Sequence, residues 1–236
     1  MKLAIEHLSK NFDRKQVLRD VSFTFEQGKI YGLIGRNGAG KTTFFNCVNE
    51  DIPIDGGHVS IIDNEGTKKA VTSDEIGYVL SVPVVPEFLT AREFLKFFME
   101  INEDKIWNKQ SIDDYFAFMK IDEEDRDRLM KDYSHGMKNK MQMLVNFIAQ
   151  PSILLLDEPL TSFDVVVAEE MKQMLRRIKK DHVIIFSTHI MELALDLCDE
   201  IVILNQGTLE EVKRGDDSNT QWKDKIIGAL IGDDHD

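Results

Sequence analysis

The chain has 236 residues, and its 42 acidic against 29 basic side chains give a formal net charge of −13. This length allows one large domain or two small ones and is enough to bury a substantial core. A charge of this sign disfavours binding to nucleic-acid backbones, which depends on clustered lysine and arginine. No apolar run approaches the roughly 18–20 residues that span a bilayer, and the N-terminus lacks the apolar segment of a secretory signal. We therefore expect a cytoplasmic protein without a nucleic-acid partner.

Alternating strand and helix patterns run along most of the chain and indicate an α/β fold. Residues 21–25 alternate apolar and polar side chains, as a half-buried strand does. Residues 208–210 follow a strand and the turn Asn205-Gln206-Gly207, which is typical of a hairpin. The other predicted strands are 29–34, 58–62, 76–80, 153–157, 182–187 and 200–204.

Between residues 88 and 148 the strand patterns give way to helical ones. Thr90-Ala91-Arg92-Glu93 is a capping box, in which Thr90 caps a helix and Glu93 reaches back to it. Ser111 marks a second helix start. We expect residues 88–148 to form a helical subdomain that is inserted into an α/β core.

That core is predicted to be discontinuous, with residues 1–87 and 149–214 on either side of the insertion. Residues 215–236 form an acidic tail with few large apolar side chains, and we expect part of it to be mobile. Cys47 and Cys198 lack the spacing of a redox or zinc site, so we expect both thiols to be reduced and buried.

The strongest motif is a glycine-rich loop between a predicted strand and a predicted helix. It matches G-x-x-x-x-G-K-[ST] at each fixed position, and the flanking strand and helix argue against a coincidental turn. Backbone N–H groups of such a loop surround phosphate oxygens, and the helix N-terminus adds partial positive charge. The lysine supplies a charge to the β and γ phosphates, and the final hydroxyl can ligate Mg²⁺. The predicted nucleotide-binding residues are Gly35, Arg36, Asn37, Gly38, Ala39, Gly40, Lys41, Thr42 and the adjacent Thr43.

Polar residues also follow two further buried strands. Asp157 and Glu158 come directly after Ile153-Leu154-Leu155-Leu156, at the sheet edge where α/β folds bind ligands. Asp157 is suited to hold Mg²⁺, and Glu158 is suited to act as general base on a water. A lone histidine is usually structural. The place of His189 after another core strand brings it to the same edge as Lys41, however, which favours a contact with the γ-phosphate.

These residues resemble the nucleotide-binding subunits of ABC transporters, from Leu8 to about Glu211. The diagnostic part is Tyr133-Ser134-His135-Gly136-Met137, which is similar to the L-S-G-G-Q signature. Ser134 and Gly136 match the signature, whereas the other positions depart from it. The resemblance implies a P-loop NTPase core of ABC ATPase type, with an N-terminal antiparallel β part and the inserted helical subdomain. It also implies that Ser134 and Gly136 act on ATP held by the other subunit of a homodimer or heterodimer.

Three further positions follow the family pattern less closely. The run 160–164 resembles the D-loop, and its Asp164 is placed to cap the helix 165–180. Phe12 stands where the family places an aromatic that stacks on adenine, with core packing as the even alternative. Ser81 stands where the Q-loop glutamine near Mg²⁺ is expected, unless a shifted loop register puts it outside the site.

The resemblance implies an ATPase subunit at the cytoplasmic face of the membrane, with the membrane-spanning part on a separate chain. The Tyr-Ser-x-Gly-Met form of the signature is similar to that of exporters of antibiotics, peptides or lipids. The alternative is a soluble ABC ATPase of DNA repair, chromosome structure or translation. The single compact ATPase half and the absence of a heptad run argue against it. A module that binds ATP without turnover is a further alternative, disfavoured by the intact Lys41, Asp157, Glu158 and His189.

Overall fold

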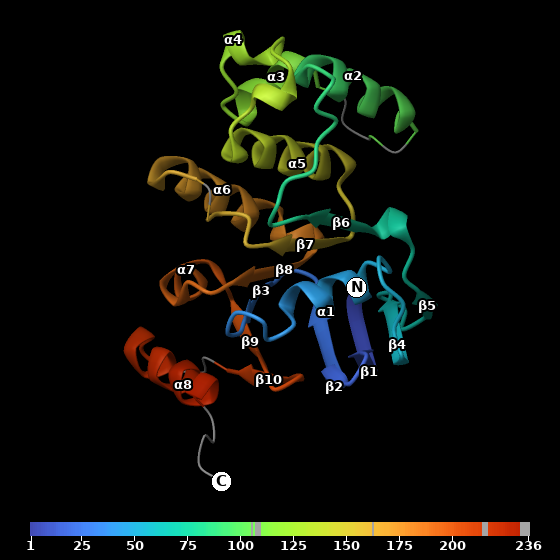
Figure 1. The fold of residues 1–236 in the computed structure, drawn as a ribbon, viewed down its shortest axis with the longest axis vertical. Coiled ribbons are helices and arrows are strands. Elements are labelled where there is room, and N and C mark those ends of the chain that lie inside the picture. Colours follow the sequence, from blue (N-terminus) through green and yellow to red (C-terminus); the bar gives the residue numbers. More distant parts are fainter. Residues whose placement is uncertain (105, 107–109, 162, 214–216, 232–236) are drawn as a thin grey trace.

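Two sheets and a layer of helices make up the architecture of the chain (Figure 1). The structure is a computed structural model that describes residues 1–104, 106, 110–161, 163–213 and 217–231. A six-stranded, mostly parallel sheet crosses the middle, and a four-stranded antiparallel sheet lies beside it. Helices α2 to α5 form a separate layer at the opposite end of the molecule from the C-terminus (Figure 1). The prediction of an α/β fold is therefore confirmed.

The six-stranded sheet has the order β10-β9-β3-β8-β7-β6. Only the β9–β10 pair is antiparallel, and it forms the predicted hairpin. Its turn places Gln206 at φ 46° and Gly207 at φ 83°, the left-handed backbone that tight hairpin turns require. The strands are β3 Ile30–Ile34, β6 Ile76–Val79, β7 Ile153–Asp157, β8 Val183–Thr188, β9 Glu200–Asn205 and β10 Thr208–Val212.

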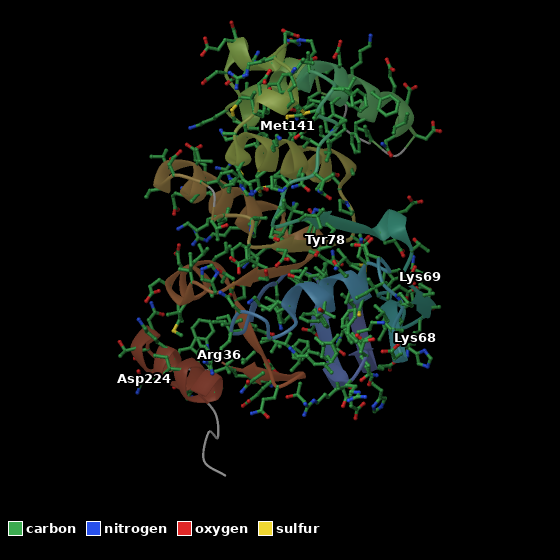
Figure 2. The ribbon with its side chains drawn as sticks, viewed as in Figure 1. Arg36, Lys68, Lys69, Tyr78, Met141 and Asp224 are labelled. Carbon is green, nitrogen blue, oxygen red and sulfur yellow. The ribbon has the colours of Figure 1, made fainter. Side chains whose placement is uncertain are left out.

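The four-stranded sheet has the order β2-β1-β4-β5, with every pair antiparallel. Residues 21–25 and 58–62 were predicted as strands, whereas β1 and β5 were not. Strand β5 is an edge, and Figure 2 shows its Lys68 and Lys69 at the border of the molecule. Lysine on an edge strand opposes pairing with another chain. The strands are β1 Lys2–Phe12, β2 Lys15–Glu26, β4 Gly56–Ile62 and β5 Lys68–Ala70.

Helix α1, Lys41–Val48, packs between the two sheets. Its Phe44 and Phe45 are fully buried, with the Phe44 ring centroid 6.3 Å from that of Phe25 on β2. The Phe25 ring in turn meets Tyr31 of β3 edge to face at 5.0 Å. Aromatic side chains thus join both sheets to the helix that follows the glycine-rich loop.

The helical layer has a second core on the other side of the six-stranded sheet. Thr90 caps its first helix by accepting a hydrogen bond from Glu93 N at 3.2 Å, and Ser111 caps the next by accepting from Asp114 N at 3.1 Å. Both predicted helix starts are therefore confirmed. Figure 2 shows Met141, which is fully buried, between α5 and the helices above it. The helices are α2 Ala91–Ile101, α3 Ile112–Phe118, α4 Glu123–Arg126 and α5 His135–Ala149.

The remaining helices share the core of the helical layer, and among them α7 packs against β3 and β8 and α8 against β9 and β10 (Figure 1). The predicted helix 165–180 ends two residues early and continues as a short 3₁₀ turn over Lys179–Asp181. The helices are α6 Val165–Ile178, α7 Met191–Leu197 and α8 Asn219–Ile231.

Helix α8, within the predicted tail, was not predicted from the sequence. Its Trp222 is fully buried and donates a hydrogen bond of 3.0 Å from Nε1 to the carbonyl of Val212. Ile226 is buried as well, so the helix is held by packing against the β9–β10 hairpin. Residues 214–216 and 232–236 of the predicted core end and tail lie outside the described residues. Within the described residues, no helix has the length and apolar character needed to cross a membrane.

Candidate nucleotide-binding site

A pocket of about 340 Å³ lies at the carboxyl ends of β3 and β7, where the glycine-rich loop and the acidic pair meet. This is the edge at which α/β sheets bind ligands. Most of the residues predicted for ATP and Mg²⁺ line it. They are Phe12, Asn37, Gly38, Gly40, Lys41, Thr42, Thr43, Ser81, Asp157 and Glu158.

The glycine-rich loop connects β3 to α1 in a backbone that needs glycine at defined positions. Gly38 and Gly40 have φ of 79° and 106°, where a side chain would strain the backbone. At Gly35 a Cβ would lie 2.7 Å from the carbonyl oxygen of Leu204, so packing excludes a side chain there too. Gly35, Arg36 and Ala39 belong to the loop without lining the pocket. Ala39 N closes the loop by donating to Arg36 O at 3.0 Å.

Lys41 is the first residue of α1, and its charge is held inside the loop. The side chain is largely buried, and Nζ donates a hydrogen bond of 2.8 Å to the carbonyl oxygen of Gly35. Burial lowers the pKa of Lys41, while the nearby carboxylates of Glu158 and Asp157 oppose that shift. A phosphate group would add negative charge beside the ammonium and stabilise its charged form further.

Thr42 and Asp157 form the oxygen-rich part of the pocket. Thr42 Oγ1 donates a hydrogen bond of 2.8 Å to Asp157 Oδ2, across the gap between α1 and the end of β7. The other carboxylate oxygen of Asp157 accepts a hydrogen bond from the hydroxyl of Ser187 on β8. Asp157 is buried, so these two hydroxyls replace the water that its charge would otherwise attract.

Glu158 and His189 are in direct contact at the same edge. Nδ1 of His189 lies 2.7 Å from Glu158 Oε2. Glu158 has a φ of 49°, and its N–H donates to Ser187 Oγ at 3.1 Å. His189 itself does not line the pocket, and its side chain is half-exposed. Any approach of His189 to a phosphate therefore takes place beside the Glu158 carboxylate.

Phe12 and Ser81 both line the pocket. Phe12 is 47% exposed and lines the pocket, so core packing is wrong for this residue. Ser81 also lines the pocket, as the alternative with an unshifted loop register predicts. Lys15 and Val17 were missed by the sequence analysis and line the same pocket. Only their place in the strand that follows Phe12, with Lys15 paired directly opposite it, could have indicated them.

The signature and D-loop residues lie away from this pocket. Ser134 caps α5 by accepting from Met137 N at 3.2 Å, and Gly136 follows in the first turn. Asp164 caps α6 by accepting from Val166 N at 2.9 Å, as predicted. None of the three lines the pocket of the same chain. Ser162 of the D-loop run lies outside the described residues.

Comparison with known proteins defines the family. The sequence profile of the ABC transporter family matches residues 18–161. The sulfate/thiosulfate import ATP-binding protein CysA 2 of Agrobacterium fabrum is 30% identical over 238 residues, which cover 99% of this chain and 70% of that protein. The uncharacterized ABC transporter ATP-binding protein YxlF of Bacillus subtilis is 29% identical over 97% of this chain and 79% of its own length.

Solved structures agree with this result. One described as the ATP-binding subunit of an ABC transporter has a TM-score of 0.81 and 25% identity, and covers 98% of this chain and 100% of its own. The ATP-binding cassette MJ0796, solved as a dimer with ADP and Pi, shares the fold with a TM-score of 0.74 at 18% identity, over 89% of this chain and 99% of its own. The chain thus belongs to the ABC transporter family. It is the ATP-binding subunit of an ABC transporter and an ATPase of that class.

Proposed function

We propose that the chain hydrolyses ATP with Mg²⁺ in this pocket and thereby drives transport through a separate membrane subunit. The observation that carries the proposal is the meeting of Lys41, Thr42, Asp157 and Glu158 in one pocket. These residues supply a cation for phosphates, two oxygen ligands and a carboxylate base, which together are the parts of phosphoryl transfer.

The donor set fits Mg²⁺. Thr42 Oγ1 and Asp157 Oδ2 are only 2.8 Å apart, and Mg²⁺ prefers oxygen ligands and keeps several waters. Bound between these oxygens and the nucleotide, the ion would neutralise charge on the β and γ phosphates. Ser81 is the third proposed member of the metal site, and its hydroxyl would act through a water.

Hydrolysis then follows from the positions of the side chains. The glycine-rich loop holds the phosphates with its N–H groups, and Lys41 places its ammonium against the β and γ phosphates. Glu158 accepts a proton from water as the water oxygen bonds to the γ-phosphorus, and the bond to the bridging oxygen of ADP breaks. His189, 2.7 Å from Glu158, orients that carboxylate and contacts the γ-phosphate. Phe12 stacks on the adenine.

A second ATPase subunit completes the site in the proposed assembly. Ser134 is exposed at the start of α5 and lies outside the pocket of its own chain. With Gly136 and Asp164 it would meet the nucleotide of a partner, in a homodimer or heterodimer. Val165 and Val166 next to Asp164 are exposed apolar side chains, which a partner subunit would cover. Residues 88–148 are proposed as the subdomain that carries this signature against a core of 1–87 and 149–214.

The membrane subunit is proposed to dock beside Ser81. Val82, Val84 and Phe88 are 71%, 69% and 79% exposed and lie in the segment that follows this pocket residue in the chain. An apolar surface of this kind favours a protein partner. Force applied there would reach the nucleotide through Ser81. The chain would then sit at the cytoplasmic face of the membrane.

Export is the proposed direction of transport, because the Tyr-Ser-x-Gly-Met form of the signature at 133–137 is similar to that of exporters. Import is the second candidate, because CysA 2 and the CysA of Halalkalibacterium halodurans, 25% identical to this chain, carry names of sulfate/thiosulfate import. Labelled sulfate uptake by cells with wild-type chain or Lys41→Ala separates the two. Uptake that requires Lys41 would overturn export.

Two variants test the ATPase roles. Lys41→Ala removes the charge that binds ATP, so we expect weak binding and no dimer on gel filtration with Mg-ATP. Glu158→Gln keeps the shape and loses the base, so ATP should bind, a stable dimer should form and turnover should collapse. Equal behaviour of the two variants would show that the roles are wrongly assigned.

A further inference from the structure

Asn139 lies on the buried side of α5 and contacts the turn that follows Glu158. Its side chain is 1% exposed, and Nδ2 donates a hydrogen bond of 2.7 Å to the carbonyl oxygen of Pro159. The amide orientation follows from this contact, because only the NH₂ group of the side chain can donate to a carbonyl. The helical layer is thus joined to the strand side of the pocket by a buried hydrogen bond directly after the acidic pair.

The same side chain carries an unsatisfied acceptor. Asn139 Oδ1 is buried and has no hydrogen-bond partner within the described part of the chain. A buried acceptor in this state lowers the stability of the folded protein. An apolar residue of the same shape would therefore serve packing better. The hydrogen bond from Nδ2 to the carbonyl of Pro159 therefore explains an amide at this position better than packing does.

Contacts from opposite sides fix the turn around Glu158. Ser187 on β8 accepts the N–H of Glu158, and Asn139 on α5 holds the carbonyl of Pro159. Thr161 Oγ1 closes the turn by donating to Glu158 O at 2.9 Å. Because Glu158 has a φ of 49°, which residues other than glycine rarely adopt, its surroundings must maintain that conformation. Loss of the Asn139 contact would release the helix side of the turn.

The buried face of α5 contacts the backbone beside the pocket at two places. The helix begins at its cap Ser134, and the Asn139 amide lies about 7.5 Å along the helix from there. Gln142, on the same face, approaches the carbonyl of Leu80 with Nε2 at 3.5 Å, next to Ser81. A shift of α5 would therefore act on the backbone next to Glu158 and next to Ser81.

We infer that Asn139 is a positioning residue for ATP hydrolysis that ties the orientation of Glu158 to the placement of α5. The inference rests on the proposed function, because it takes Glu158 as the general base and Ser134 as the residue that meets the partner's nucleotide. Nucleotide bound at Ser134 holds α5 in place, and the Asn139 hydrogen bond passes this placement to the turn after Glu158. Turnover depends on that bond, whereas ATP binding by the glycine-rich loop does not.

The experiment compares steady-state ATP hydrolysis with fluorescent-ATP binding in the full chain carrying Asn139→Leu, which keeps the shape and removes both amide groups. We expect a kcat about tenfold lower, with KM, nucleotide affinity and melting temperature at their wild-type values. Asn139→Ala removes the same donor without branched bulk and should show the same loss of kcat. The matched control is Asn146→Leu, because among the described residues the hydrogen bond of Asn146 Nδ2 stays within α5, to Gln142 O at 2.8 Å.

A wild-type kcat in an Asn139 variant that folds overturns the inference. So does a fall in kcat that Asn146→Leu reproduces, or a change in KM at constant kcat. Glu158→Gln separates these results from failure of the proposed function. If Glu158→Gln keeps full turnover, Glu158 is not the general base and the proposed function fails. If turnover collapses in Glu158→Gln but is unaffected in the Asn139 variants, only the role of Asn139 is rejected.

Discussion

The hydroxyl of Ser187 donates a hydrogen bond to Oδ1 of Asp157 between the neighbouring strands β8 and β7. The same hydroxyl oxygen accepts the N–H of Glu158 at 3.1 Å. Ser187 is fully buried, so no water can replace it at either place. A single hydroxyl thus contacts two consecutive residues of the pocket, because it donates to the carboxylate of Asp157 and accepts from the backbone N–H of Glu158.

Ser187→Ala should therefore weaken the use of Mg²⁺ as well as stability. The change leaves Oδ1 of Asp157 without a donor and the N–H of Glu158 with only a longer bond to the Ser187 carbonyl at 3.3 Å. We expect a higher Mg²⁺ concentration at half-maximal ATPase rate and a loss of about 1–3 kcal/mol in unfolding free energy. A Mg²⁺ titration of activity and urea denaturation measure the two effects.

Thr188→Val is the matched control for this prediction. Thr188 is equally buried, and its Oγ1 accepts the N–H of Ile190 at 3.0 Å instead of contacting either acid. It should cost stability without moving the Mg²⁺ requirement. An unchanged Mg²⁺ curve in Ser187→Ala would show that Asp157 does not need the hydroxyl for its metal role.

Ser81→Gln should lower the Mg²⁺ concentration needed or raise the basal rate. Serine is shorter than glutamine and reaches the metal only through water, whereas an amide can reach it and the attacking water directly. The expected gain is worth about 0.5–1.5 kcal/mol, the value of a single hydrogen bond. Ser81→Ala is the control, and Mg²⁺ titrations of all three forms make the comparison. Coincident curves would remove Ser81 from the metal site.

Ser134→Arg should abolish the rise of specific ATPase activity with protein concentration, because its bulk blocks pairing. Binding of ATP to the single chain should persist, since Ser134 does not line the pocket. The change also removes the α5 cap, at a cost of about 1 kcal/mol. Ser111→Arg removes a comparable cap from α3 and should keep the concentration dependence. The composite site would be contradicted if the wild-type chain were monomeric by light scattering and its specific activity did not change with protein concentration.

Cys47 and Cys198 should resist alkylation in the native protein. Both are buried and unpaired, as predicted, and burial raises the pKa of Cys47 to about 11 and that of Cys198 still further. In the folded state the Cys47 thiol stays protonated above its usual pKa of 9.0. The free energy of unfolding therefore falls as pH rises from 9 towards 11. Iodoacetamide labelling at pH 8, with and without urea, measures the protection. Rapid labelling without urea would contradict it.

Local chemistry explains which parts of the fold could be predicted. The glycine-rich loop and the acidic pair carry their function within consecutive residues, so their place at the sheet edge follows from the strands before them. Strand β1 was missed because its register shifts between Ile5 and Leu8, where His7 has a φ of 54° and breaks the alternation. Helix α8 was missed because contacts outside its own sequence anchor it, among them the hydrogen bond of Trp222 to Val212 and the burial of Ile226.

The connections within the site were also beyond the sequence. Ser187 contacts an acid on another strand, and Asn139 contacts a carbonyl in the turn after β7. Nothing in the pattern of either segment distinguishes these side chains from solvent-facing ones. Lys15 enters the pocket only because the β1–β2 hairpin places it opposite Phe12. Partners of this kind become visible once the strand order is known.

The fluorescence of the buried indole of Trp222 can also report on the docking of α8. The sequence holds two tryptophans, at 107 and 222, so replacing Trp107 by phenylalanine would leave a single fluorophore. Because Trp222 is fully buried and hydrogen-bonded to Val212, undocking of α8 would shift its emission to longer wavelength as water reaches the ring. Lys223 pairs with Glu192 on α7, the helix that follows His189. A fluorimeter could thus follow, in real time and without a dye, whether events at the nucleotide reach the last helix.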